Sequence, residues 1–232
     1  MNKEVKRNLI IVGIFAAAMA FVEAMIVYYL RKLYYTGGAL FPINILIPSS
    51  VIWLEWFREI ATIVMLLAVA FLVARKFKDK FAYFIYAFAV WDIFYYIWLK
   101  VTLNWPAHLM EWDILFLIPT LWASPWIIPV ICSALMLILA IAILKFPRIE
   151  IKPKEWIMLI VSALAFIASF VWNYLAIHLA YNNSIPKLTQ ALTTYVPTRY
   201  QWWLFVIGVV FAVWAICSFW KRAKKGRKIN VF

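Results

Sequence analysis

The chain alternates long apolar stretches with short polar segments. A helix that crosses a lipid bilayer needs about 20 consecutive, mostly apolar residues. Six stretches meet this length, at about residues 9–30, 51–74, 81–103, 125–144, 156–179 and 202–220. The pattern predicts an all-α integral membrane protein, a six-helix transmembrane bundle that forms one domain over residues 1–232 and ends in a basic tail at 221–232.

The fourth stretch is preceded by a segment that does not suit a regular helix. Ser124 followed by Pro125 is typical of a helix start, since the hydroxyl caps the helix and proline fits its first position. Residues 112–123 therefore lie before the fourth helix and not within it. We expect an interfacial or re-entrant segment there, whose backbone polar groups are satisfied by protein or water.

Composition strengthens the membrane interpretation. Hydrophobic residues make up 67% of the chain and charged residues 14%, whereas soluble domains have about half apolar and about a quarter charged residues. This excludes a water-soluble globular protein. A cleaved signal peptide is the alternative for the first stretch, because residues 16–20 include small alanines. The apolar run continues to residue 30, which favours a retained helix.

The distribution of Lys and Arg predicts the orientation of the bundle. Most of the 23 basic residues lie in the N-terminal lead, in the loops after the second and fourth helices, and in the C-terminal tail. Cytoplasmic segments of membrane proteins collect basic residues, so both termini are predicted to be cytoplasmic, in the plasma membrane of a prokaryote. The net charge of +13 then serves orientation and contact with anionic lipid headgroups. Nucleic-acid binding is not expected, because the basic residues form no single patch.

Ionisable side chains within the predicted spans are the main functional candidates, because each costs about 2.5 to 3.5 kcal/mol at the membrane centre. Glu23 lies in the first helix, Glu55, Arg58 and Glu59 lie in the second, and Asp92 lies in the third. At about 1.5 Å per residue, Glu23 and Glu59 are each about 12 Å below the outer ends of their helices, and Asp92 about 16 Å. Acids outnumber the single Arg at this depth, which favours a binding site.

Other polar side chains complete the candidate site. Tyr96 follows Asp92 by one helical turn and can donate its hydroxyl, Asn173 lies about 9 Å below the outer end of the fifth helix, and Asp113 lies in the loop above. The predicted ligand-, proton- or cation-binding residues are Glu23, Glu55, Arg58, Glu59, Asp92, Tyr96, Asp113 and Asn173. A divalent metal is one cofactor such a site could hold, with Glu23, Glu59 and Asp92 as its ligands.

Three functions fit these residues. The leading hypothesis is a site in the outer half of the membrane that binds or translocates a cation, a proton or a small polar solute. The second is an intramembrane enzyme that uses paired carboxylates on a lipid-soluble substrate, which would require an opening toward lipid. The third is an accessory subunit of a larger membrane complex. A purely structural lock, in which Arg58 neutralises its acidic neighbours, is the alternative without a ligand.

Several chemistries lack their motifs. The chain has no Gly-rich phosphate loop, no His-Glu-x-x-His and no Cys-x-x-Cys sequence. Haem is not expected, because His108 lies in a loop and His178 at a helix end, where neither suits axial ligation. Cys132 and Cys217 are predicted at different depths, too far apart for a disulfide.

Ala16, Ala20 and Ala24 form a stripe of small residues on the first helix, which lets another helix approach closely. In its size, its six spans and this stripe, the chain is similar to the substrate-binding components of energy-coupling-factor vitamin transporters. The resemblance implies that the stripe docks a partner membrane subunit. Glu23 lies on the same stripe, and the resemblance does not account for an acid at that position.

Overall fold

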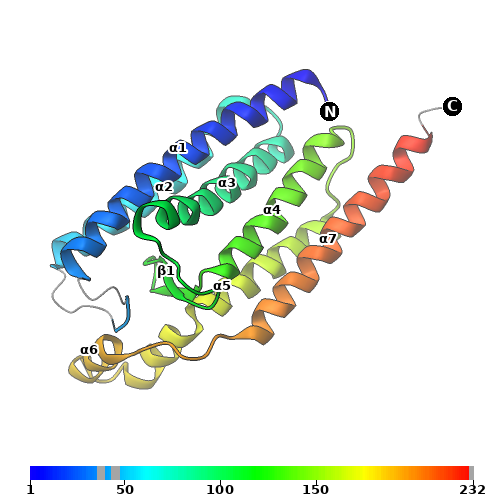
Figure 1. The fold of residues 1–232 in the computed structure, drawn as a ribbon. Coiled ribbons are helices and arrows are strands. Elements are labelled where there is room, and N and C mark those ends of the chain that lie inside the picture. The colour runs from blue at the N-terminus through cyan, green and yellow to red at the C-terminus, as the bar shows by residue number, and fades with distance from the viewer. Residues whose placement is uncertain (36–39, 43–47, 230–232) are drawn as a thin grey trace.

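The structure is a computed structural model that describes residues 1–35, 40–42 and 48–229 (Figure 1). Its elements are α1 Lys3–Tyr34, α2 Ser49–Val73, α3 Phe77–Leu103, β1 Trp112–Phe116, β2 Trp122–Pro125, α4 Ile127–Lys145, α5 Pro153–Tyr181, α6 Ile185–Thr194 and α7 Trp202–Ile229. Six of the helices, all except α6, are long and apolar enough to cross a membrane. The prediction of six helical spans is confirmed at this level.

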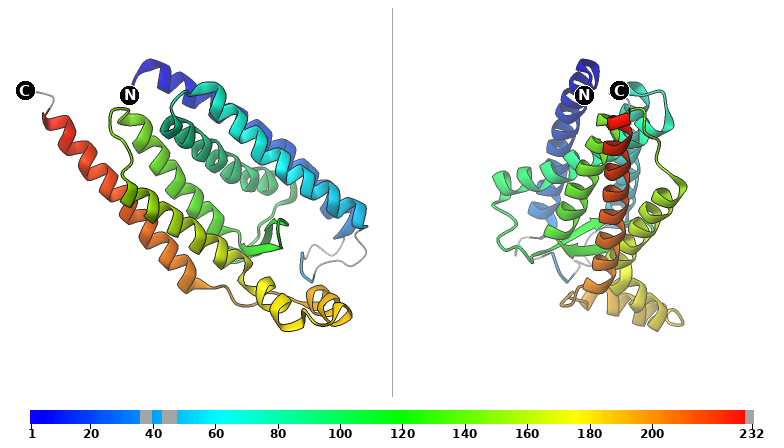
Figure 2. Two further views of the ribbon diagram at one scale, coloured as in Figure 1. Left: turned by 180° about the vertical axis from the view of Figure 1, so that it is seen from behind. Right: turned by 90° about the vertical axis from the view of Figure 1, so that its right-hand side faces the viewer.

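The helix ends differ from the predicted ones by a few residues, except at the C-terminus. There α7 continues to Ile229, so most of the segment predicted as a basic tail is a continuation of the last helix. Six long helices that alternate in direction return the chain to the end of the bundle at which it began. Accordingly, the start of α1 and the end of α7 lie at the same end of the bundle (Figures 1 and 2).

Helix α3 is the centre of one half of the bundle, and α5 with α7 forms the other half. Helix α3 packs against α1, α2 and α4, while α5 packs mainly against α7. Helix α4 joins the halves, because it packs on both α3 and α7. The view from behind in Figure 2 shows α2 and α5 as separate helices on the near face of the bundle, with α3 and α4 between them.

The alanine stripe of α1 is covered by the same chain. Ala16, Ala20 and Ala24 are fully buried, and α1 packs along α3. Side chains of α3 reach the backbone of α1: the indole N–H of Trp98 donates to the carbonyl of Ala17 at 3.0 Å. The prediction that the stripe docks a partner subunit is therefore wrong. Its small residues serve the close approach of α1 and α3.

Residues 112–125 form a β-hairpin, so the chain is not entirely α-helical. Strands β1 and β2 pair antiparallel, with Asp113 opposite Ser124 and Ile114 opposite Ala123. Because Ser124 pairs in this ladder, it does not cap a helix, and α4 begins only at Ile127. The ladder satisfies part of the backbone of the segment that we predicted to be interfacial or re-entrant.

The end of the bundle that holds both termini is fixed by buried ionic contacts. The ammonium group of Lys78 donates to the carbonyls of Pro147 and Ile149 at 2.7 and 2.9 Å. Glu155 at the start of α5 pairs with Arg222 of α7 and accepts the hydroxyl of Ser218 at 2.8 Å. These contacts hold the α4–α5 loop and α7 in place, away from the candidate site.

Candidate functional site

A cavity of about 1020 Å³ lies within the bundle. All the helices and the turn of the hairpin contribute residues to its wall. All but one of the predicted site residues line it. The ionisable acids and arginines on the wall are Glu23, Arg31, Glu55, Arg58, Glu59, Asp92 and Asp113.

Arg58 is at the centre of the first ionic group. Its Nη2 and Nε atoms donate to Oε2 of Glu55 at 2.7 and 2.9 Å, and it also forms an ion pair with Glu23 of α1. Glu55 and Arg58 are three residues apart on α2 and therefore share one face of the helix. The hydroxyl of Thr62, one turn further along α2, lies 3.4 Å from Oε2 of Glu23. Together these contacts connect α1 and α2 across the cavity wall.

Glu59 binds the backbone of the hairpin. Its oxygens Oε1 and Oε2 accept the N–H of Leu117 at 2.9 and 3.0 Å. Leu117 directly follows β1, so this N–H lies at the turn and outside the strand ladder. The side chain of Glu59 is buried, and it supplies the acceptor that a backbone N–H away from water requires.

Asp113 is at the centre of a second ionic group. Oδ1 lies 3.3 Å from Nη2 of Arg31, and Oδ2 accepts the hydroxyl of Tyr96 at 3.0 Å. The guanidinium of Arg31 also lies over the ring of Trp105, 3.8 Å from its centre. Burial raises the pKa of Asp113 from 3.8 to about 6, and Arg31 and the hydroxyl of Tyr96 oppose this rise.

Arg31 is not among the site residues predicted from the sequence, because the first predicted helix ends at residue 30. The spacing carried the information, because residues at intervals of four or eight share a helical face. Arg31 follows Glu23 by eight residues and Val27 by four, and all three line the cavity. The face of α1 that holds Glu23 therefore continues to Arg31.

Asp92 of α3 is hydrogen-bonded to α4. Its Oδ2 accepts the hydroxyl of Ser133 on α4 at 2.7 Å. The prediction placed Asp92 beside Glu23 and Glu59, but its hydrogen-bond partner comes from the opposite side, through the packing of α3 on α4.

Asn173 lies outside this arrangement. Its Nδ2 donates to the carbonyl of Arg199 at 3.1 Å, and its Oδ1 accepts Nε2 of Gln201 at 3.3 Å. It is not among the described residues that line the cavity. Its contacts instead hold the segment that leads into α7.

The expected metal ligands do not converge. Within the described parts of the chain, no three His, Cys, Asp or Glu side chains form a group that could hold a metal ion. Glu23 pairs with Arg58, Glu59 with the hairpin backbone, and Asp92 with Ser133. The geometry therefore gives no support for Glu23, Glu59 and Asp92 as one metal site.

The remainder of the cavity wall is mostly apolar. Aromatic residues of α3 face aliphatic residues of α4 and α5 along it, namely Phe81, Phe84, Phe88, Leu135, Leu139, Leu159 and Ile160. From Asp92 to Phe81 this wall follows about 16 Å of α3, at about 1.5 Å per residue. At its far end the rings of Phe81 and Trp156 are in contact, with centroids 4.8 Å apart. One cavity therefore has a charged part beside the hairpin, which we call its outer part, and a long apolar part toward the end of the bundle that holds both termini, which we call the apolar groove.

No protein family model, curated protein or solved structure matches the chain.

Proposed function

We propose that the protein binds an amphiphilic, membrane-soluble molecule in this cavity. The polar end of the ligand would lie near Arg58, in the outer part of the cavity, and its hydrocarbon part would lie in the apolar groove between α3 and α5. The observation that carries the proposal is the continuity of these two environments within one cavity of about 1020 Å³.

The size and lining of the cavity favour an organic ligand over a bare ion. Small-molecule sites typically measure about 300 to 1,000 Å³ and are mostly apolar, with a few polar groups that orient the ligand. A cation or a proton needs only a small polar site. The apolar groove beside Phe84 and Phe88 would contribute nothing to binding such a ligand, but it suits an alkyl or isoprenoid chain.

Entry from the lipid phase between α2 and α5 is consistent with the packing of these helices. Helix α2 packs mainly against α3, and α5 mainly against α7, yet residues of both line the cavity. A ligand that arrives from the bilayer would therefore not have to separate two packed helices. Such a route would be the lateral opening expected for a site that handles a lipid-soluble molecule.

The ionic groups can be explained in part as a structural lock. Arg58 with Glu23 and Glu55 would hold α1 and α2 together without any ligand. A lock, however, requires no cavity beside it, and a void in a packed bundle costs stability. The combination of ion pairs and an open volume supports a binding site more than a lock.

The membrane placement belongs to the same proposal. The six long helices would cross the bilayer with both termini in the cytoplasm, so that the hairpin lies toward the outer side. Glu59, which binds the hairpin turn, is ten residues beyond the start of α2 at Ser49, which corresponds to about 15 Å along the helix. This depth supports a re-entrant hairpin whose backbone is satisfied by its own ladder and by Glu59.

Binding or translocation of a small cation, a proton or a polar solute is the second candidate. It is favoured by the excess of acids, since five carboxylates and two guanidinium groups line the cavity. The apolar groove distinguishes the two candidates. Blocking it would abolish binding of an amphiphile, but it would leave an ion site near Arg58 intact.

The test uses a matched pair of substitutions. Ala163 lines the apolar groove, so Ala163→Trp should fill it, whereas Ala68 is exposed on α2 and is not among the described lining residues. Native mass spectrometry of the purified protein would count bound dodecyl amphiphiles. We expect Ala163→Trp to weaken their binding by at least about tenfold and Ala68→Trp to leave it unchanged. Equal binding by both variants would overturn the proposal.

A further inference from the structure

We infer that the polar end of the bound amphiphile is a cationic, ammonium-type group and that Glu55 is its principal acceptor. This inference rests on the proposed function, because it names the chemistry of the ligand for the same cavity. Four features of the outer part of the cavity carry it: an open acceptor on Glu55, a second on Asp92, the balance of charge on the wall, and the aromatic rings around it.

Glu55 uses only one of its carboxylate oxygens within the protein. Both hydrogen bonds from Arg58 end on Oε2, and no donor to Oε1 is found among the described residues. The side chain is 14% exposed and lines the cavity. An ionised carboxylate accepts about four hydrogen bonds, so Glu55 offers an acceptor to the cavity.

Asp92 shows the same pattern deeper in the site. Its Oδ2 accepts the hydroxyl of Ser133 at 2.7 Å, and the described part of the chain provides no donor for Oδ1. The residue is 8% exposed, and it too lies on the cavity wall. A second open acceptor therefore faces the same interior space.

The charges on the wall favour a cation. The carboxylates of Glu23, Glu55 and Glu59 lie around the single guanidinium of Arg58, while Arg31 is paired with Asp113. Uncompensated negative charge in a medium of low dielectric constant is costly, and a bound cation offsets it. A primary ammonium also brings three N–H donors to the open oxygens.

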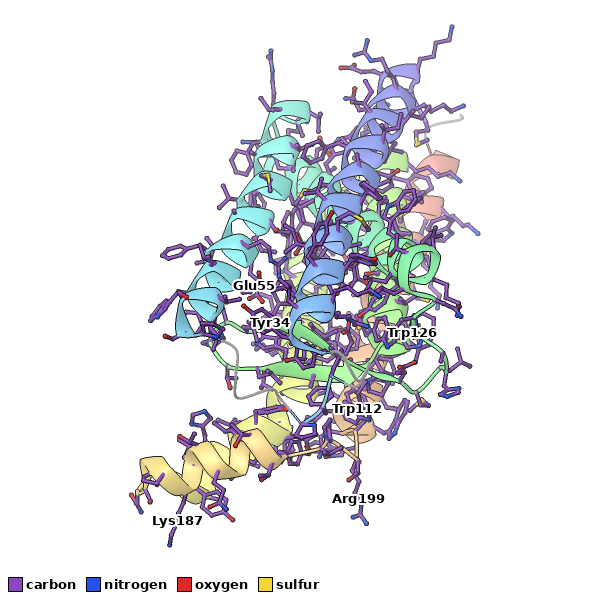
Figure 3. All side chains as sticks on the ribbon, turned by 60° about the vertical axis from the view of Figure 1, so that its left-hand side comes forward. Tyr34, Glu55, Trp112, Trp126, Lys187 and Arg199 are labelled. Atoms are coloured by element: carbon purple, nitrogen blue, oxygen red, sulfur yellow. The ribbon has the colours of Figure 1, made fainter. Side chains whose placement is uncertain are left out.

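Aromatic rings line the same outer part of the cavity. Trp56 directly follows Glu55, and Tyr95 and Tyr34 also belong to the wall. Tyr34 and Glu55 are labelled in Figure 3. The faces of Trp and Tyr rings attract ammonium groups through their quadrupoles, by about 0.5 to 2 kcal/mol each. Carboxylates combined with aromatic rings favour an ammonium head group over a neutral polyol.

The experiment compares three probes that share one hydrocarbon tail: dodecylamine as its ammonium form, dodecanol and dodecanoate. Their affinities for the purified full-length protein would be measured near neutral pH by competition in native mass spectrometry. We expect dodecylammonium to bind at least about tenfold more tightly than the other two. Glu55→Gln should reduce this preference, mainly by weakening the binding of dodecylammonium. Glu150→Gln, which removes a 70% exposed acid outside the cavity, should change nothing.

The comparison in the unmodified protein is decisive even if Glu55→Gln fails to fold. Equal affinity for the three probes, or tighter binding of dodecanoate, would overturn the ammonium inference and leave the amphiphile proposal standing. Binding of none of them, or binding that Ala163→Trp leaves unaffected, would overturn the proposed function itself. Preference for the ammonium probe that persists in Glu55→Gln would remove Glu55 as its acceptor.

Discussion

Glu59 accepts the backbone N–H of Leu117 with both carboxylate oxygens, at 2.9 and 3.0 Å. A side chain in the middle of a predicted membrane helix thus supplies the partner that the turn of a β-hairpin lacks. The contact joins α2 to an element that otherwise packs on α4 and α5. It therefore fixes the distance between the two sides of the cavity at the level of the hairpin.

Removing this acceptor should destabilise the hairpin. We expect Glu59→Ala to cost about 1 to 3 kcal/mol, because it leaves the partly buried N–H of Leu117 without its acceptor. Glu59→Gln should cost less, because its amide oxygen can still accept. Thermal unfolding in detergent would measure the difference. Hydrogen exchange of residues 112–122 should become faster in Glu59→Ala. Glu111→Ala, which removes an acceptor for the exposed N–H of Ala107, serves as the control, and equal exchange in both variants would refute the assigned role.

Asp113 should titrate within an accessible pH range. Burial raises its pKa from 3.8 to about 6, so between these values the folded protein keeps a proton that the unfolded chain releases. The contribution of protonated Asp113 to the free energy of unfolding is therefore fully present below pH 3.8 and is lost as the pH rises through about 6. Infrared spectra should show a carboxylic C=O band with a midpoint near pH 6 that is missing in Asp113→Asn. Tyr96→Phe should shift the midpoint upward, since the hydrogen bond from Tyr96 lowers the pKa of Asp113 in the unmodified protein. In the unmodified protein, a midpoint near 3.8 would contradict the burial of Asp113.

The helical spans were predictable because length and hydropathy determine them directly. The hairpin was not predicted, although Trp112, Ile114 and Phe116 give its first strand the aromatic and β-branched residues that are enriched in strands. The prolines in this region were interpreted as signs of an irregular segment. Helix α6 was also missed, although Ser184 followed by Ile185 and Pro186 resembles the start of a helix. In both cases the signal was present but short beside the strong hydropathy pattern.

The site was predictable in its membership more than in its contacts. Depth along each helix brought Glu23 and Glu59 to one level, and both line the cavity. The depth of a residue along its helix does not determine toward which neighbour its side chain points. Asn173, at a similar predicted depth, therefore contacts Arg199 in the segment before α7 and not the cavity. The partners Leu117 and Ser133 depend on how the hairpin and α4 pack against the other helices. No local pattern in the sequence encodes that packing.

Arg58 should behave as one unit with its two acids. We expect Arg58→Gln to destabilise the protein by about 3 to 5 kcal/mol, because Glu23 and Glu55 are left buried without their cation. Combining it with Glu55→Gln should cost less than the sum of the single changes, since the interacting pair is then removed together. Unfolding in detergent would give the three values. As a control, Lys187→Gln at an exposed position of α6 should change the free energy of unfolding by no more than about 0.5 kcal/mol. Additive effects of Arg58→Gln and Glu55→Gln would rule out the coupling.

The alanine stripe should tolerate no larger residue. Ala20 is fully buried, whereas Val22 on the same helix is 59% exposed. Ala20→Leu forces side chains into the packed contact of α1 with α3, which should cost about 1 to 3 kcal/mol, while Val22→Leu should be neutral within about 0.5 kcal/mol. Thermal unfolding of the two variants makes the comparison. Loss of a partner protein from Ala20→Leu without any loss of stability would restore the docking role.

The orientation of the bundle can be tested with single cysteines. The native thiols Cys132 and Cys217 are free and would first be replaced by Ala. Arg148 is exposed in the basic loop between α4 and α5, and Asn183 is exposed between α5 and α6, so the two lie beyond opposite ends of α5. Because basic loops are retained in the cytoplasm, a membrane-impermeant maleimide should label Asn183→Cys in intact cells and Arg148→Cys only after permeabilisation. The reverse pattern would place the hairpin and the charged part of the cavity on the cytoplasmic side, so that a ligand from the outer leaflet would meet the apolar groove first.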